Sequence, residues 1–123
     1  MFFAKKPDPN QLIIDEIQKI IMLFLEEDNW CKRALARDKS GEQLFDPWSK
    51  EAVQWDVYGA LYAFDASPKT VEYLQRRAKT WGYSDIDRLN DLNEHFYLMQ
   101  FLKESLNLLG ASYKVTYKDG DTL

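Results

Sequence analysis

Apolar residues recur every three or four positions in four long stretches of this chain, at residues 9–27, 47–65, 68–81 and 93–109. This spacing places side chains on one face of an α-helix, whereas a half-buried strand alternates apolar and polar residues. The rhythm is clearest in the first stretch, where it is carried by Ile13, Ile14, Ile17, Ile20, Ile21, Phe24 and Leu25. The pattern predicts an all-α, single-domain bundle of four principal helices, with a short helical turn near 85–89.

Start and stop signals accompany these stretches. Asp8 precedes a proline and is the predicted N-cap of the first helix, and Ser67 followed by Pro68 predicts the start of the third. Gly82 and Gly110 follow the third and the last stretch, where glycine accepts the left-handed backbone that ends many helices. The predicted helices therefore have local signals of their own.

The stretch at 47–65 is apolar over the widest arc. One stripe contains Val53, Val57, Ala60, Leu61 and Phe64, and a neighbouring aromatic ridge contains Trp48, Trp55, Tyr58 and Tyr62. A helix with so wide an apolar arc belongs at the centre of a bundle, in contact with several others. Gly59 lies in its middle, where glycine disfavours a helix, so we expect another helix to approach its backbone closely.

The segment after the last helix alternates like a strand. At residues 112–118, Tyr113, Val115 and Tyr117 alternate with polar residues. The sequence offers no second strand for this segment to pair with. We therefore predict that it docks on another chain, a partner or a second copy, with an unattached tail as the alternative.

Composition narrows the class of protein. The chain has 123 residues, of which 46% are hydrophobic and 29% charged, enough for one domain with its own core. We expect a single helical domain over residues 1–123, with an N-terminal arm at 1–8 and the strand-like tail at 111–123. The net charge of −4 disfavours binding to nucleic acid through phosphates.

The sequence holds one cysteine, Cys31, and one histidine, His95. An internal disulfide is excluded and a standard structural zinc site lacks ligands, so we expect no metal or other cofactor. The longest apolar run, residues 20–25, is far shorter than the ~18 residues that suggest a membrane span. The N-terminus has no signal-peptide pattern, and we expect a cytoplasmic protein that binds no membrane.

A more specific pattern runs through the middle of the chain. It consists of Trp30, Ala34-Leu35-Ala36-Arg37-Asp38, Gly41, Asp46-Pro47, Ala52-Val53-Gln54-Trp55 and Gly59-Ala60-Leu61, followed later by Asn90-Asp91. Over about residues 12–109 the chain resembles a family of small uncharacterised bacterial and phage helical proteins. It departs from that family's pattern at Asn29, Asp56 and Leu89, where the family has Gly, Cys and Trp. The resemblance implies a small helical domain and no particular chemistry.

Acidic and amide side chains are concentrated in one short segment, which contains Asp85, Asp87, Asn90, Asp91 and Glu94. Several such oxygen ligands can hold a hard cation, but the spacing does not fit an EF-hand loop. The pairs Ser84 with Asp87 and Asp91 with Glu94 have the spacing of capping boxes. We therefore interpret the cluster as helix caps, with metal binding or acid–base work as the alternative.

Other polar residues have a structural and a functional interpretation. His95 lies at the rim of the last helix's apolar face, which favours a partly buried structural role over catalysis. Asp56 falls outside the apolar stripe and is expected to be solvated or a capping partner. Basic side chains occur in two groups along the chain, which would form an anion-binding patch if the fold brought them together. We favour instead that they pair with acidic faces inside the fold. The first group is Lys32, Arg33, Arg37 and Lys39, and the second is Lys69, Arg76, Arg77 and Lys79.

No catalytic signature is present in the sequence, and this absence favours a non-catalytic interaction protein that binds another protein or itself as a homodimer. A phage or mobile-element accessory, or an acidic inhibitor of an enzyme with a basic groove, are specific forms of this prediction. The alternative is a ligand-binding protein or enzyme with an aromatic pocket. That pocket would be lined by Trp30, Trp55 and Tyr58, with Asp56, Asp91 and His95 as its polar groups.

Overall fold

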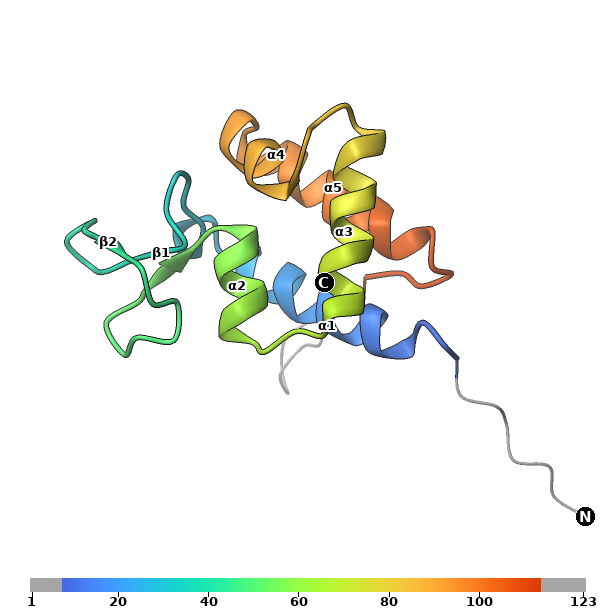
Figure 1. The fold of residues 1–123 in the computed structure, drawn as a ribbon, viewed down its shortest axis with the longest axis horizontal. Coiled ribbons are helices and arrows are strands. Elements are labelled where there is room, and N and C mark those ends of the chain that lie inside the picture. Colours follow the sequence, from blue (N-terminus) through green and yellow to red (C-terminus); the bar gives the residue numbers. More distant parts are fainter. Residues whose placement is uncertain (1–7, 114–123) are drawn as a thin grey trace, which may run out of the picture.

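A computed structural model describes residues 8–113 of the chain, which form five α-helices, one short 3₁₀ helix and a small sheet (Figure 1). The elements follow in the order α1 (Gln11–Phe24), η1 (Glu27–Asn29), β1 (Ala36–Arg37), β2 (Gln43–Leu44), β3 (Gln54–Trp55), α2 (Val57–Ala63), α3 (Pro68–Thr80), α4 (Ile86–Leu92) and α5 (His95–Asn107). The protein is therefore mostly helical but not purely all-α.

The core lies between α1, α3 and α5, with α2 and α4 beside them (Figure 1). The isoleucines of α1 are buried, as their spacing predicts, and they pack against apolar residues of the other helices such as Leu74, Leu98 and Leu102. The predicted helices at 9–27, 68–81 and 93–109 are confirmed within a few residues at each end. The predicted turn at 85–89 is the start of the longer helix α4.

The predicted helix at 47–65 is wrong over its first half, because only Val57–Ala63 is helical. The backbone of Gln54 and Trp55 pairs instead with Arg37 and Ala36 of β1, so its N–H and C=O groups are satisfied by a sheet. Val53 is 44% exposed rather than in the core. Periodicity alone did not reveal that a strand interrupts this apolar stretch.

The sheet has the order β2-β1-β3, and both of its pairings are antiparallel. Between β1 and β2 the chain reverses in a turn at Asp38–Gly41, where the N–H of Gly41 donates to the backbone oxygen of Asp38. The carboxylate of Asp38 accepts hydrogen bonds from the backbone N–H groups of Ser40 and Glu42, at 2.9 Å each. Gly41 has the positive φ of +86° that this turn requires.

Gly59 allows a close approach between two backbones. A Cβ atom at this position would overlap the carbonyl oxygen of Leu35. The neighbour is the chain before β1, and not another helix as the sequence led us to expect. Because Leu35 also accepts a hydrogen bond from the N–H of Asp56, at 3.3 Å, the start of α2 is held directly against the sheet.

The predicted N-cap is found at the start of α3 but not at the start of α1. Ser67 caps α3 and Pro68 is its first residue, as predicted. At α1, however, the helix begins after Asn10, and the carboxylate of Asp8 accepts from the N–H of Asn10 at 2.8 Å. Glu16 of α1 is buried and accepts from the hydroxyl of Thr70 at 2.7 Å, so its carboxylate connects α1 to α3.

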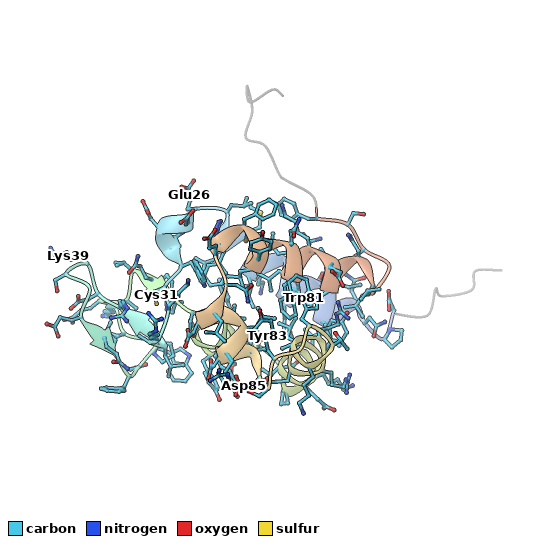
Figure 2. All side chains as sticks on the ribbon, turned by 90° about the horizontal axis from the view of Figure 1, so that it is seen from above. Glu26, Cys31, Lys39, Trp81, Tyr83 and Asp85 are labelled. Atoms are coloured by element: carbon cyan, nitrogen blue, oxygen red, sulfur yellow. The ribbon has the colours of Figure 1, made fainter. Side chains whose placement is uncertain are left out.

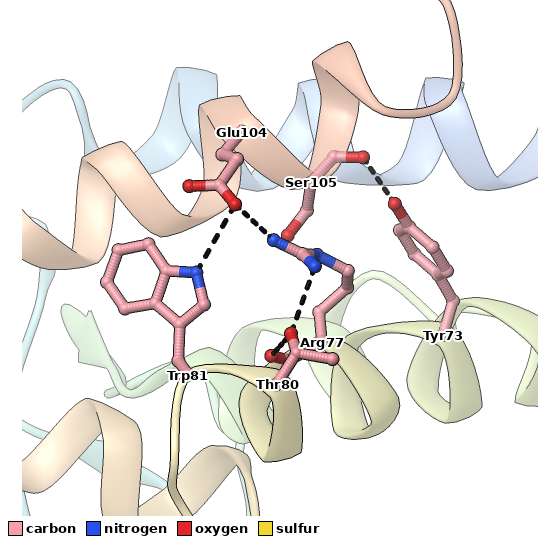
Figure 3. A network of polar contacts seen from close by, with 6 residues as sticks. All are labelled: Tyr73, Arg77, Thr80, Trp81, Glu104 and Ser105. Atoms are coloured by element: carbon pink, nitrogen blue, oxygen red, sulfur yellow. Dashed lines mark hydrogen bonds and ion pairs between the residues drawn. The ribbon is translucent and has the colours of Figure 1, made fainter.

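Polar contacts also connect α3 to α5 (Figure 3). The guanidinium of Arg77, largely buried, forms an ion pair with Glu104 and donates to the hydroxyl of Thr80 at 3.0 Å. The hydroxyl of Tyr73 donates to the backbone oxygen of Ser105 at 2.6 Å. These bonds fix how the two helices lie against each other.

Candidate functional site

Asn90 is a buried hub between the sheet region and the helices. Its side-chain oxygen accepts from the indole Nε1 of Trp30 at 2.7 Å and from the backbone N–H of Val57 at 3.1 Å. Its side-chain nitrogen donates to the backbone oxygen of Cys31 at 3.1 Å and to the carboxylate of Asp91 at 3.1 Å. With every polar atom of its amide bonded, Asn90 has a structural role that the sequence did not reveal.

Asp56 is the N-cap of α2, where its carboxylate accepts from the N–H of Gly59 at 2.6 Å. The expected capping role is confirmed, but the expected exposure is wrong, because the helix starts after Asp56 and its side chain turns inward. Removal from water raises the pKa of Asp56 to about 7. The carboxylates of Asp87 and Asp91 add to this effect, and the hydrogen bond from Gly59 opposes it.

Within the acidic segment around α4, Asp85 alone caps the helix that follows it through its side chain. Asp85 caps α4 by accepting from the N–H of Arg88 at 2.8 Å, and Asp91 accepts from the N–H of Arg33 at 2.9 Å. Neither predicted capping box forms, because the N-cap of α4 is Asp85 rather than Ser84, and Glu94 precedes α5 without a side-chain cap. Among residues 8–113 there is no group of three or more acidic, His or Cys side chains that could hold a metal ion.

His95 is the first residue of α5 and is partly buried, as expected. Its Nε2 lies 2.6 Å from the backbone oxygen of Phe24, and its ring packs against Trp30 with 5.7 Å between the ring centroids. The Nδ1 lies 3.6 Å from the carboxylate of Glu27. Both ring nitrogens therefore face groups of the protein itself.

The predicted aromatic pocket is divided between separate parts of the surface. Trp30 and His95 line one hollow of about 650 Å³, whereas Asp56 and Asp91 line another of about 380 Å³. Trp55 lies in β3, and its indole nitrogen donates to the backbone oxygen of Pro47 at 3.0 Å. The six predicted residues do not converge on one site.

Three aromatic side chains are in ring contact instead, two of them exposed and the third, Tyr58, half-buried. The ring of Trp48 lies 6.0 Å from that of Tyr62, which lies 4.9 Å from that of Tyr58. We call Trp48, Tyr62 and Tyr58 the aromatic row. Trp48 is 61% exposed and Tyr62 41%, and the neighbouring side chain of Tyr62 contributes most to raising the pKa of Tyr58 to about 12. The sequence predicted these residues on one helical ridge, but Trp48 lies in a loop before β3 and not in α2.

The two basic groups do not form a common patch. Lys39 lies at one end of the molecule, away from Trp81 at the end of α3 (Figure 2). The guanidinium of Arg37 donates to the backbone oxygens of Gly41 and Lys32, at 3.0 and 2.9 Å, and Arg77 pairs with Glu104. The favoured pairing with acidic side chains is found for Arg77 and, at the surface, for Arg76 with Glu72, whereas Arg37 bonds to backbone oxygens.

The strand-like segment falls mostly outside the described residues. Tyr113 is within them, and its hydroxyl donates to the sulfur of Met22 at 3.3 Å while Lys103 lies over its ring at 5.6 Å. Val115 and Tyr117 lie outside residues 8–113, so the docking prediction for this segment stays a prediction.

Comparisons of the chain with family models, with curated proteins and with solved structures find no match. The resemblance to small bacterial and phage helical proteins therefore stays a prediction. Among residues 8–113, moreover, every helix is too short or too polar to cross a membrane.

Proposed function

We propose that this protein is a non-catalytic binding module that contacts another protein through the aromatic row. The observation that carries this proposal is the exposure of Trp48 and Tyr62 in direct ring contact with each other. Large aromatic side chains that lie together on a surface are typical of protein interfaces, where Trp and Tyr supply much of the binding energy. Single exposed apolar residues would not support the same conclusion.

The backbone beneath the aromatic row is held by several bonds. Asp56 caps the helix that bears the two tyrosines, and Asn90 accepts from the N–H of Val57 at its first residue. On the loop side, the N–H of Trp48 donates to the carboxylate of Asp46 at 2.8 Å. A surface whose rings are already positioned loses less conformational entropy on binding, which favours affinity.

The two residue types best suited to catalysis are occupied elsewhere. Burial raises the pKa of Cys31 to about 12, so its thiol is protonated at neutral pH and is a poor nucleophile. His95 faces the backbone oxygen of Phe24 and lies in a different hollow from Asp56 and Asp91. These placements favour binding over nucleophilic or acid–base catalysis.

Affinity capture from cell lysate with matched variants tests the proposal. The baits are the wild type, the double variant Trp48→Ala/Tyr62→Ala, and Leu108→Ala, a control after α5 at an equally exposed apolar side chain. We expect a protein that the wild type and the control retain equally and that the double variant loses by at least about tenfold, the loss typical of hot-spot residues. Circular dichroism checks that all three baits are equally helical.

The proposal is contradicted if all three baits capture the same proteins in the same amounts. Sedimentation of the purified chain covers the case of a homodimer. If the partner is a second copy, the wild type and Leu108→Ala associate with the same affinity, and Trp48→Ala/Tyr62→Ala stays monomeric.

A further inference from the structure

Acidic side chains lie beside the aromatic row at its Tyr58 end. The carboxylates of Asp87 and Asp85, at the start of α4, are near enough to Tyr58 to contribute to its raised pKa. Helices α2 and α4 pack against each other, so these carboxylates and the row belong to neighbouring elements. Asp46, which accepts from the backbone of Trp48, adds an exposed carboxylate at the other end.

The carboxylates at the Tyr58 end are not neutralised within the described part of the chain. Neither Asp85 nor Asp87 forms an ion pair with any residue in 8–113, Arg88 included. The pKa of Asp87 is raised by partial burial and by the neighbouring carboxylates of Asp85 and Asp91. A positive charge brought to this place would therefore relieve a repulsion that already exists.

We propose that the aromatic row binds a basic segment of a partner protein, whose Arg or Lys side chains lie against the rings and reach Asp85 and Asp87. This inference rests on the proposed function and adds the chemistry of the partner. Arg and Lys cations are attracted to the faces of Trp and Tyr rings. Exposed rings bordered by carboxylates thus offer a cation two favourable contacts at once, and they repel acidic or phosphate-rich partners.

Selection from a library identifies the chemistry without knowledge of the partner. Random 12-residue peptides displayed on phage are selected on the immobilised wild-type protein, with Trp48→Ala/Tyr62→Ala used to remove peptides that bind elsewhere. We expect the retained peptides to be enriched in Arg and Lys and to carry a net positive charge. Retained peptides that are neutral or acidic overturn the basic-partner inference but leave the aromatic row as a binding site.

Matched charge variants then locate the contact. Asp85→Asn/Asp87→Asn and Glu26→Gln/Asp28→Asn both change the net charge by the same amount, and Glu26 lies on the opposite side of the molecule from Asp85 (Figure 2). Asparagine keeps the side-chain oxygen with which Asp85 caps α4. Fluorescence anisotropy with the selected peptides should show affinity about tenfold weaker for the first variant and unchanged for the second.

The outcomes separate the two proposals. Equal weakening by both charge variants shows attraction to the net charge alone and overturns the inference. A selection that yields no peptide dependent on Trp48 and Tyr62 overturns the proposed function itself, and the basic-partner inference falls with it.

Discussion

The indole Nε1 of Trp30 donates a 2.7 Å hydrogen bond to the side-chain oxygen of Asn90, across 60 positions of sequence. The same oxygen accepts from the N–H of Val57, at the start of the helix that bears Tyr58 and Tyr62. One buried amide therefore connects the segment after η1, helix α2 and helix α4. The position of the aromatic row depends on this connection.

Replacing Asn90 by Ala should destabilise the fold strongly. The variant leaves buried polar groups of Trp30, Val57 and Cys31 without partners, and each unsatisfied group costs about 1–3 kcal/mol. We expect the free energy of unfolding, measured by urea denaturation, to fall by about 4 kcal/mol. Asn107→Ala, at an exposed position of α5, is the control and should change it by less than about 0.5 kcal/mol. Equal effects of the two substitutions would contradict the hub role.

Asp56 should make stability depend on pH. Its pKa is raised from 3.8 to about 7 in the folded protein, so the folded state holds this proton more tightly than the unfolded chain does. The resulting stabilisation is complete below about pH 4 and is lost as the pH rises to about 7. Asp56→Asn keeps a capping oxygen but has no charge to bury.

The free energy of unfolding of Asp56→Asn should therefore exceed that of the wild type by about 4 kcal/mol at pH 8. The difference should shrink towards pH 4, where the wild-type carboxyl is protonated in the folded state. Urea denaturation at a series of pH values measures this difference. A difference that stays constant between pH 4 and pH 8 would show that Asp56 does not titrate in this range.

Gly59→Ala should lower stability because its Cβ would meet the backbone of Leu35, which has little freedom to move. We expect a loss of about 3 kcal/mol in the free energy of unfolding, at the upper end of the usual cost of overpacking. Gly82→Ala separates this effect from backbone strain, because Gly82 has a φ of +95° with open space around the added Cβ. Gly82→Ala should lower the free energy of unfolding by only about 1 kcal/mol. A similar loss in both variants would argue against the close approach of Gly59 to Leu35.

The ion pair between Arg77 and Glu104 should contribute more than an exposed pair. Arg77 is largely buried, so Glu104→Gln leaves its charge without a partner in a place of limited solvation. We expect the free energy of unfolding, measured by thermal or urea denaturation, to fall by about 2 kcal/mol. Glu72→Gln breaks the exposed pair with Arg76 on the same helix and should cost less than about 0.5 kcal/mol.

Much of the helical architecture was predictable because its signals are local. The isoleucines of α1 follow the helical period, and they are buried. Ser67 and Pro68 start α3 at the predicted position, and Gly82 follows its end with a positive φ. These features depend on side-chain spacing and on the conformational preferences of single residues, which the sequence states directly.

The candidate site was only partly predictable. Trp48, Tyr58 and Tyr62 were recognised as one aromatic ridge, but the helix that was to carry it begins at Val57. The ridge is assembled from a loop and a helix, because Trp55 joins the sheet and its indole nitrogen bonds to the backbone of Pro47. Neither the strand pairing of Trp55 nor its bond to Pro47 can be predicted from the spacing of apolar residues.

The sequence by itself determined where most helices lie and which of their faces are apolar, because both follow from spacing within a few turns. Only the tertiary structure decided that Asp56 and Glu16 are buried and that Asn90 is a hub. Those roles depend on partners 33 to 60 positions away along the chain or on the precise start of a helix. The identity of a polar residue does not reveal whether it is exposed or buried, because its burial depends on the residues that surround it in the folded protein.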